Sequence, residues 1–223
     1  MGLFSSPAVI PAKVVDPATV TYVSTAGSAS NLTTYTFTSQ SFGTAHADRI
    51  LVCTVGGQGQ AAGAKSVSSL TIGGISATLV KAQQGLTLDY FRSEIWRAAV
   101  PTGTSGTVVI NWNDTMETCI SGLFSVITKT AAPYATAGIG GDGATQISTT
   151  ISSPDNGIIL GCHYGNSTPD TWSGLTERYD THPSTQSGSG ASDAFASAQT
   201  SKSIGVTPGG GAQHALALAS WGP

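Results

Sequence analysis

Aromatic rings and hydrogen-bonding side chains gather in one stretch of this chain, residues 163–182, which reads HYGNSTPDTWSGLTERYDTH. Aromatic rings can stack on a sugar, while carboxylate and guanidinium groups bind its hydroxyls. The stretch therefore predicts a carbohydrate-type ligand site formed by Tyr164, Asp170, Trp172, Arg178, Tyr179, Asp180 and His182. The alternative is that Trp172 fills the end of a hydrophobic core, because a tryptophan buries a large area.

The sequence lacks the residue patterns that hydrolytic enzymes need. The nucleophile turn G-x-S-x-G does not occur in the sequence. A glycosidase needs two carboxylates on either side of the scissile bond, one of them with a raised pKa. Glu94 and Glu117 fall on separate expected strands, and a cross-strand charge partner such as Arg92 explains them more simply. We therefore expect no enzyme and no catalytic residues.

Two further patterns resemble cofactor or metal sites. Residues 138–143 match G-x-G-x-x-G, but they follow a Pro-Ala loop and no strand–helix–strand unit surrounds them. Asn111, Asn113, Asp114 and Glu117 lack the glycine and the spacing of a calcium loop, and an Asx turn accounts for them. We expect a glycine loop at 138–143, no cofactor and no metal.

Composition restricts the class of protein. Charged residues make up 9% of the chain, against about 25% in an average globular protein. With nine Lys and Arg, a net charge of −3 and no basic patch, nucleic-acid binding is not expected. No apolar run approaches the roughly 18 residues of a membrane span. A surface rich in hydroxyls and poor in charge is typical of proteins that work outside a cell or on a particle.

The three cysteines, Cys53, Cys119 and Cys162, each fall within an expected strand. Their number is odd, and none has a partner at metal-ligand spacing. We expect buried, reduced cysteines that pack as small hydrophobic residues.

The elements that must position these groups are strands. Residues 92–130 read as three consecutive strands, a meander with turns at 101–106 and at Asn113-Asp114. Residues 67–72 and 75–80 form a hairpin around Gly73-Gly74. Residues 49–55 and 158–164 are apolar on both faces, as in strands covered on both sides. Residues 131–146 and 165–190 read as loops.

A dozen or so short strands with frequent turns, and no run of helical period, predict an all-β fold. We expect one β-sandwich or jelly-roll domain over residues 21–223. Its core is predicted to contain Ile50, Val52, Val108, Ile110, Trp112, Ile120, Phe124, Ile158 and Leu160.

Residues 1–20 read as an extended N-terminal arm, interrupted by three prolines and without a signal-peptide pattern. The arm is too apolar to prefer water and too interrupted to build its own core. It predicts an attachment segment on a neighbouring subunit, and the alternative is packing against its own domain. The attachment residues are predicted to be Phe4, Val9, Ile10, Val14 and Val15.

Several segments resemble a recurring type of virion protein from tailed bacteriophages and gene-transfer agents, the tail-fibre, head-fibre or minor structural type. The likeness lies in DRILV at 48–52, SLTIGGISATLV at 69–80, SEIWRAAVPTGTSGTVVI at 93–110, TWSGLTERY at 171–179 and ALALASW at 215–221. The resemblance implies an oligomeric jelly-roll component of a virion. It supplies no catalytic residues for this sequence.

Two functional hypotheses follow. The first is a non-enzymatic structural protein of a phage-like virion, a surface fibre, spike or capsid decoration unit. It would be made in the host cytoplasm and released by lysis, and its partners would be other virion proteins, copies of itself and host surface carbohydrate. The second is a carbohydrate-binding module of a secreted or surface protein. Neither hypothesis involves nucleic acid or membrane insertion.

Overall fold

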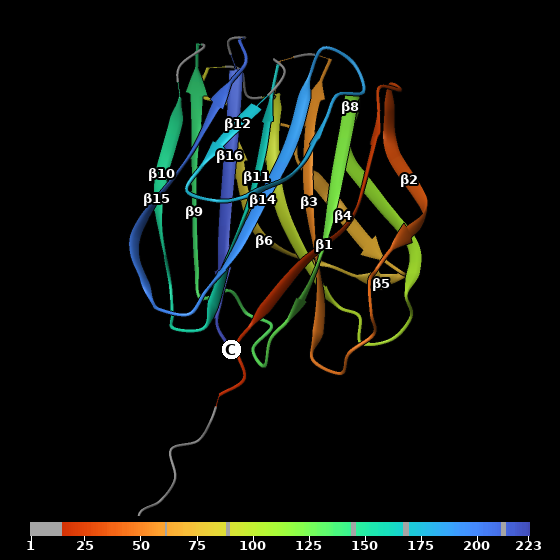
Figure 1. Ribbon diagram of the computed structural model, residues 1–223. Coiled ribbons are helices and arrows are strands. Elements are labelled where there is room, and N and C mark those ends of the chain that lie inside the picture. The colour runs from red at the N-terminus through yellow and green to blue at the C-terminus, as the bar shows by residue number, and fades with distance from the viewer. Residues whose placement is uncertain (1–14, 61, 88–89, 144–145, 167–169, 211–212) are drawn as a thin grey trace, which may run out of the picture.

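The computed structural model describes residues 15–60, 62–87, 90–143, 146–166, 170–210 and 213–223 (Figure 1). All regular elements among these residues are β-strands, and none is a helix. The strands form antiparallel sheets stacked face to face, so the prediction of an all-β sandwich is confirmed.

In chain order the strands are β1 (Thr19–Ser28), β2 (Leu32–Ser41), β3 (Arg49–Gly59), β4 (Val67–Ile72), β5 (Ile75–Ser76), β6 (Thr78–Gln84), β7 (Phe91–Ala99), β8 (Ser105–Ile127), β9 (Ala135–Asp142), β10 (Ile147–Ser153), β11 (Gly157–Gly165), β12 (Asp170–Ser173), β13 (Glu177–Thr181), β14 (Ser187–Phe195), β15 (Gln199–Pro208) and β16 (Gln213–Trp221).

The first sheet has eight strands and is organised around β8, which is 23 residues long. The first part of β8 pairs with β2 and β4, and the second part pairs with β1 and β3. The pairing of β8 with β2, with β3 and with β4 shifts register within residues 111–118 of β8. The sheet curls at this point and encloses a first core, which includes Leu51, Val108 and Ile110.

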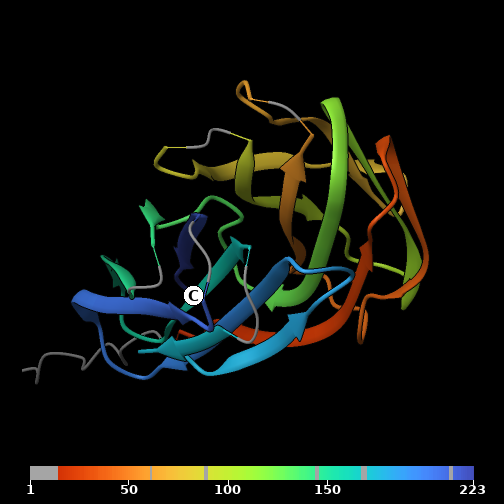
Figure 2. The same ribbon diagram turned by 90° about the horizontal axis from the view of Figure 1, so that it is seen from above.

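A five-stranded sheet, in the order β13-β14-β11-β16-β9, packs against the curled sheet (Figure 2). The second core lies between them and includes Val52, Phe124 and Leu160. A three-stranded sheet, β10-β15-β12, covers the other face of the five-stranded sheet. The third core lies between these two sheets and includes Ile159 and Leu218. Every residue of β11 and β16 is buried, which explains why 158–164 is apolar on both faces.

All nine residues predicted for the core are buried, from 0% to 4% exposed. They divide between two cores, however. Val108, Ile110 and Trp112 lie in the first, and the remaining six lie in the second. The prediction of burial is confirmed, and the single core that the sequence suggested is resolved into layers.

The predicted meander over 92–130 is wrong. β7 pairs with β3 and β6, and β3 lies between β7 and β8. The Asn113-Asp114 turn is also wrong, because β8 continues through both residues. Polar residues there accompany the bend of the strand, since Asn113 Oδ1 accepts the backbone N–H of Ser66 and Asp114 Oδ1 that of Thr115.

Two segments predicted as loops contain strands. Residues 131–146 hold β9, and 165–190 hold β12, β13 and the start of β14. The glycines of β9 serve close packing: a Cβ on Gly140 would lie 2.4 Å from the backbone oxygen of Gln84, and one on Gly138 would lie 2.7 Å from Lys81 Cε. The G-x-G-x-x-G pattern is therefore mostly strand.

The predicted hairpin around Gly73-Gly74 exists, although it is short. Both glycines have positive φ, +61° and +81°, as a two-residue type I′ turn requires. β4 and β5 pair over two residue pairs only. The chain then joins β7 through β6.

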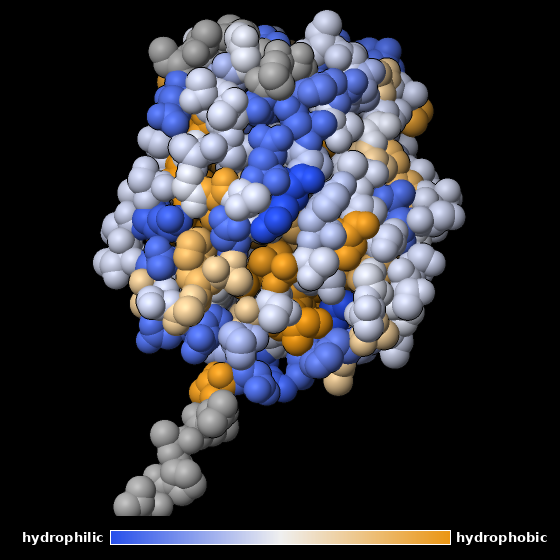
Figure 3. Space-filling model, viewed as in Figure 1, coloured by the Kyte–Doolittle hydropathy of each residue, from blue (hydrophilic) through white to orange (hydrophobic). Residues whose placement is uncertain are grey.

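At the N-terminus, β1 begins at Thr19 and Ala18 is already buried, so the folded body starts before residue 21. Ala18 N–H donates to Asn156 O at 2.9 Å. Among the predicted attachment residues, Val15 is 47% exposed, and Phe4, Val9, Ile10 and Val14 lie outside the described residues. The surface in Figure 3 is mixed, with hydrophobic residues in scattered groups between hydrophilic ones.

Candidate functional site

The aromatic residues of the predicted ligand site are separated by a sheet and turned inward. Tyr164 and Tyr179 point into the second core, and Trp172 points into the third. Their exposed fractions are 0%, 7% and 9%. Stacking of these rings on a sugar does not fit this arrangement, whereas the packing alternative for Trp172 does.

The polar residues of the same prediction are partly brought together. Asp180 Oδ2 accepts the backbone N–H of Asp170 at 2.9 Å, and His182 Nε2 lies 3.4 Å from Asp180 Oδ1. Arg178 points elsewhere, donating to Ser192 O at 2.8 Å and approaching Asp193 Oδ1 at 3.3 Å. Asp170, Asp180 and His182 therefore form a group that excludes Arg178.

Asp170 belongs to a buried polar network, which we define as His163, Asp170, Ser187, Ser189 and His214. His163 Nδ1 lies 2.7 Å from Asp170 Oδ2, and both side chains are 0% exposed. The hydroxyls of Ser187 and Ser189 donate to the same oxygen at 2.9 and 2.7 Å. The network joins β11 and β14 of the five-stranded sheet to β12 of the three-stranded one.

His214 extends the network across β11. Its ring stacks on that of His163, with centroids 5.6 Å apart and planes inclined by 23°. His214 faces Gly165 in the register of β11 and β16, where a Cβ would lie 2.6 Å from His214 Nδ1. Three buried atoms of this network have no hydrogen-bond partner among the described residues, namely His163 Nε2, His214 Nδ1 and Asp170 Oδ1.

The charge states follow from these contacts. Burial alone would raise the pKa of Asp170, but attraction to His163 and hydrogen bonds from His163, Ser189 and Ser187 outweigh it and lower the pKa. Burial lowers the pKa of His214, and the neighbouring His163 lowers it further. The network therefore favours an ionised Asp170 beside a neutral His214.

The network contains Ser, His and Asp, but its geometry is not that of a nucleophilic triad. In a triad the serine hydroxyl gives its proton to the imidazole, whose other nitrogen contacts the carboxylate. Here both serines donate to the carboxylate itself. Trp172 Nε1 also donates to the hydroxyl of Ser189 at 2.9 Å. The side chains are buried, and the arrangement fastens two sheets together.

The other residues with potential chemistry are similarly occupied. Glu94 is 1% exposed and accepts hydrogen bonds from Arg92 Nε at 2.8 Å, Trp96 Nε1 at 2.7 Å and the backbone of Val67 at 3.3 Å. Arg92 is the charge partner of Glu94, as expected, but both residues lie on β7 and the pair does not join two strands. Glu117 accepts from Gln58 Nε2 at 2.9 Å.

All three cysteines are free and buried, as predicted. Burial raises the pKa of Cys119 and that of Cys162 to about 12 and raises that of Cys53 well above its ordinary value. The reactive thiolate is therefore disfavoured. In the described part of the chain, no cluster of three or more His, Cys, Asp or Glu is arranged to hold a metal ion.

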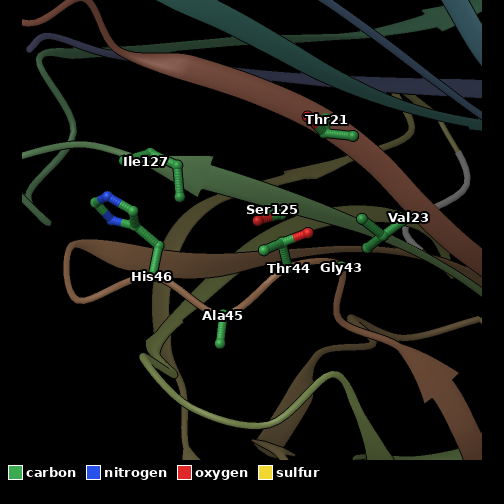
Figure 4. A pocket seen from close by; sticks show the side chains of 8 residues that line it. All are labelled: Thr21, Val23, Gly43, Thr44, Ala45, His46, Ser125 and Ile127. Carbon is green, nitrogen blue, oxygen red and sulfur yellow. The ribbon is translucent and has the colours of Figure 1, made fainter.

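An open hollow lies apart from this network, at one end of the curled sheet (Figure 4). It has a volume of about 310 Å³ and lies between β1, the end of β8 and the segment 43–46. Sequence patterns did not reveal it, because its residues come from three segments that are far apart along the chain.

Comparison of the chain with protein-family models, with curated proteins and with solved structures finds no match. Among the described residues, no helix has the length and apolar character needed to cross a bilayer.

Proposed function

We propose that this chain is a non-enzymatic structural protein of a phage-like virion, a surface fibre, spike or decoration unit. The observation that carries the non-enzymatic part is the network around Asp170. The groups that could act on a substrate, His163 and Ser189 among them, are buried and contact one another. Catalysis needs such groups to be within reach of a substrate.

The layered architecture supports a structural role. Strands β11 and β16 are buried throughout and β3 nearly so, and three hydrophobic cores lie within and between the sheets. The virion assignment itself is supported by the sequence resemblance and by the charge-poor, hydroxyl-rich composition. The attachment role of the arm is supported by its apolar residues and prolines.

The experiment is to purify particles from the producing culture on a density gradient and quantify peptides of this chain by mass spectrometry. We expect the chain to sediment with the particles in a fixed ratio to their major shell protein. If all of the chain is found in the soluble fraction, the virion assignment is wrong.

Removal of the arm tests how the protein is attached. We expect a chain that lacks residues 1–15 to fold with a nearly unchanged melting temperature, because Ala18 and β1 are retained, and to be missing from particles. A full-length control with Phe4, Val9, Ile10 and Val14 replaced by serine separates apolar contacts from mere length. Incorporation of both variants would show that the anchor lies elsewhere.

The alternative, a carbohydrate-binding module, is favoured by one observation, the open hollow of Figure 4. A soluble protein that binds saccharide and never accompanies particles would establish this alternative in place of the virion role.

A further inference from the structure

The hollow of Figure 4 is one half of a longer surface groove. Thr21 and Val23 of β1, Ser125 and Ile127 of β8, and the segment 43–46 line it. A second hollow of about 220 Å³ shares His46 and Ile127 with the first and continues past the Asp48–Lys129 ion pair. The two hollows in a row suit a ligand made of consecutive units.

The wall of the first hollow is held in place from behind. Arg49 is 1% exposed, and its guanidinium donates to six backbone oxygens. These belong to Phe42, Gly43, Thr44, Val100, Thr102 and Gly103, at 2.7–3.2 Å. Phe42 N–H donates to Thr104 O, and His46 N–H donates to Pro101 O. A wall fixed in this way loses little conformational entropy when a ligand binds.

Hydrogen-bonding capacity in the first hollow is not used by the protein. The hydroxyls of Thr21, Thr44 and Ser125 line it, and none has a hydrogen-bond partner among the described residues. His46 Nδ1 accepts the backbone N–H of Asp48 at 3.1 Å, so the neutral ring carries its proton on Nε2 and can donate it.

The remaining lining defines the ligand class. Val23 and Ile127 supply apolar contact, and none of the eight lining residues of the first hollow is a carboxylate, lysine or arginine. Hydroxyl groups around an apolar surface match a neutral molecule that carries hydroxyls of its own and C–H faces. In the second hollow, Asp16 and Asp48 offer acceptors and Lys129 offers donors to further hydroxyls.

We propose that this groove binds a neutral oligosaccharide, with its terminal sugar in the first hollow and the next sugar in the second. The inference deepens the proposed virion function, for which host surface carbohydrate is an expected partner, and rests on that function only for the source of the glycan. Particle association is measured separately, so the failure of either proposal can be recognised without the other.

The experiment is saturation-transfer NMR followed by titration of the full-length protein. The probes are neutral hexoses, N-acetylhexosamines, their disaccharides and one acidic sugar. We expect millimolar binding of at least one neutral sugar and tighter binding of its disaccharide. Binding of none of the neutral probes, or of the acidic sugar alone, would overturn the proposal.

Variants place the binding site. Ala45→Trp should fill the first hollow and abolish binding, while Ala198→Trp, at an exposed residue between β14 and β15, should not change it. Ser125→Ala should weaken binding about three- to tenfold, the effect of one lost hydrogen bond. Thr36→Val on β2 serves as its matched control. A sugar whose affinity is unchanged in Ala45→Trp binds elsewhere and contradicts the assignment.

Discussion

The network around Asp170 and the hollow beside Thr21 contain the same kinds of group, hydroxyls and histidine, yet they use them in opposite ways. In the network, Asp170 Oδ2 accepts from His163, Ser187 and Ser189, and the side chains are buried. In the hollow, hydroxyls face an open cavity without protein partners. In this protein the same residue types therefore serve packing in the network and remain available to a ligand in the hollow.

The two regions also differ in how they hold charge. The network pairs a carboxylate with a histidine inside the protein. Behind the hollow, the buried cation Arg49 contacts backbone oxygens only. Burial lowers the pKa of Arg49, although an arginine stays protonated throughout the range in which proteins fold. Its removal should therefore affect the hollow and spare the network.

The largest effect is expected from Arg49→Met. The backbone oxygens that the guanidinium satisfies would lose their donor, and we expect the free energy of unfolding to fall by about 3–5 kcal/mol. Urea denaturation gives this value. Arg97→Met is the matched control, since Arg97 has no polar partner among the described residues, and it should cost less than about 1 kcal/mol. Equal losses would show that Arg49 does not hold the wall.

A smaller effect is expected from Gly43→Ala in the same wall. Gly43 has φ +70°, and a Cβ would lie 3.0 Å from Val23 Cγ1, so the variant combines backbone strain with a contact. We expect a loss of about 1–2 kcal/mol and weaker saccharide binding. Gly74→Ala has φ +81° with nothing within 4 Å and isolates the strain. A loss no greater than in Gly74→Ala would exclude the contact with Val23.

The smallest effect is a pH dependence that arises in the network. His214 has a pKa below its ordinary 6.5 in the folded protein, so the unfolded chain binds a proton more readily. Stability is therefore lost as the pH falls through 6.5. We expect unfolding free energies measured from neutral pH to about pH 5 to decline less in His214→Gln than in wild type. An equal decline in both proteins would show that His214 does not carry the pH dependence.

Part of this fold could be predicted from the sequence because the side chains of a strand alternate between its two faces. Ile158 and Leu160 face one core while Ile159 faces another, and a strand that is apolar on both faces reports this directly. The glycines of β9 have no such period. Their positions are set by Gln84 and Lys81, which come from another part of the chain. Local patterns could not identify that strand.

The network around Asp170 could not be predicted from local sequence patterns either. Asp170 was singled out by its neighbours in the sequence, but its partners depend on strand register. Ser189 faces His163 and Ser187 faces Gly165 across β11 and β14. The alternation of serine and glycine in residues 187–190 is the one signal that could have indicated a close approach. The hollow could not be predicted either, because it forms only where β1, β8 and the segment 43–46 meet at one end of the curled sheet.

The most direct test of this account is the free energy of unfolding of Asp170→Asn, measured together with saccharide binding and compared with Asp193→Asn. We predict a loss of about 3 kcal/mol for Asp170→Asn, because a buried acceptor of charge-assisted hydrogen bonds is removed. Saccharide binding by the folded variant should be unchanged, and the partly exposed Asp193 should cost less than about 1 kcal/mol. An Asp170→Asn protein with wild-type stability that loses a hydrolytic activity present in the parent would contradict the account.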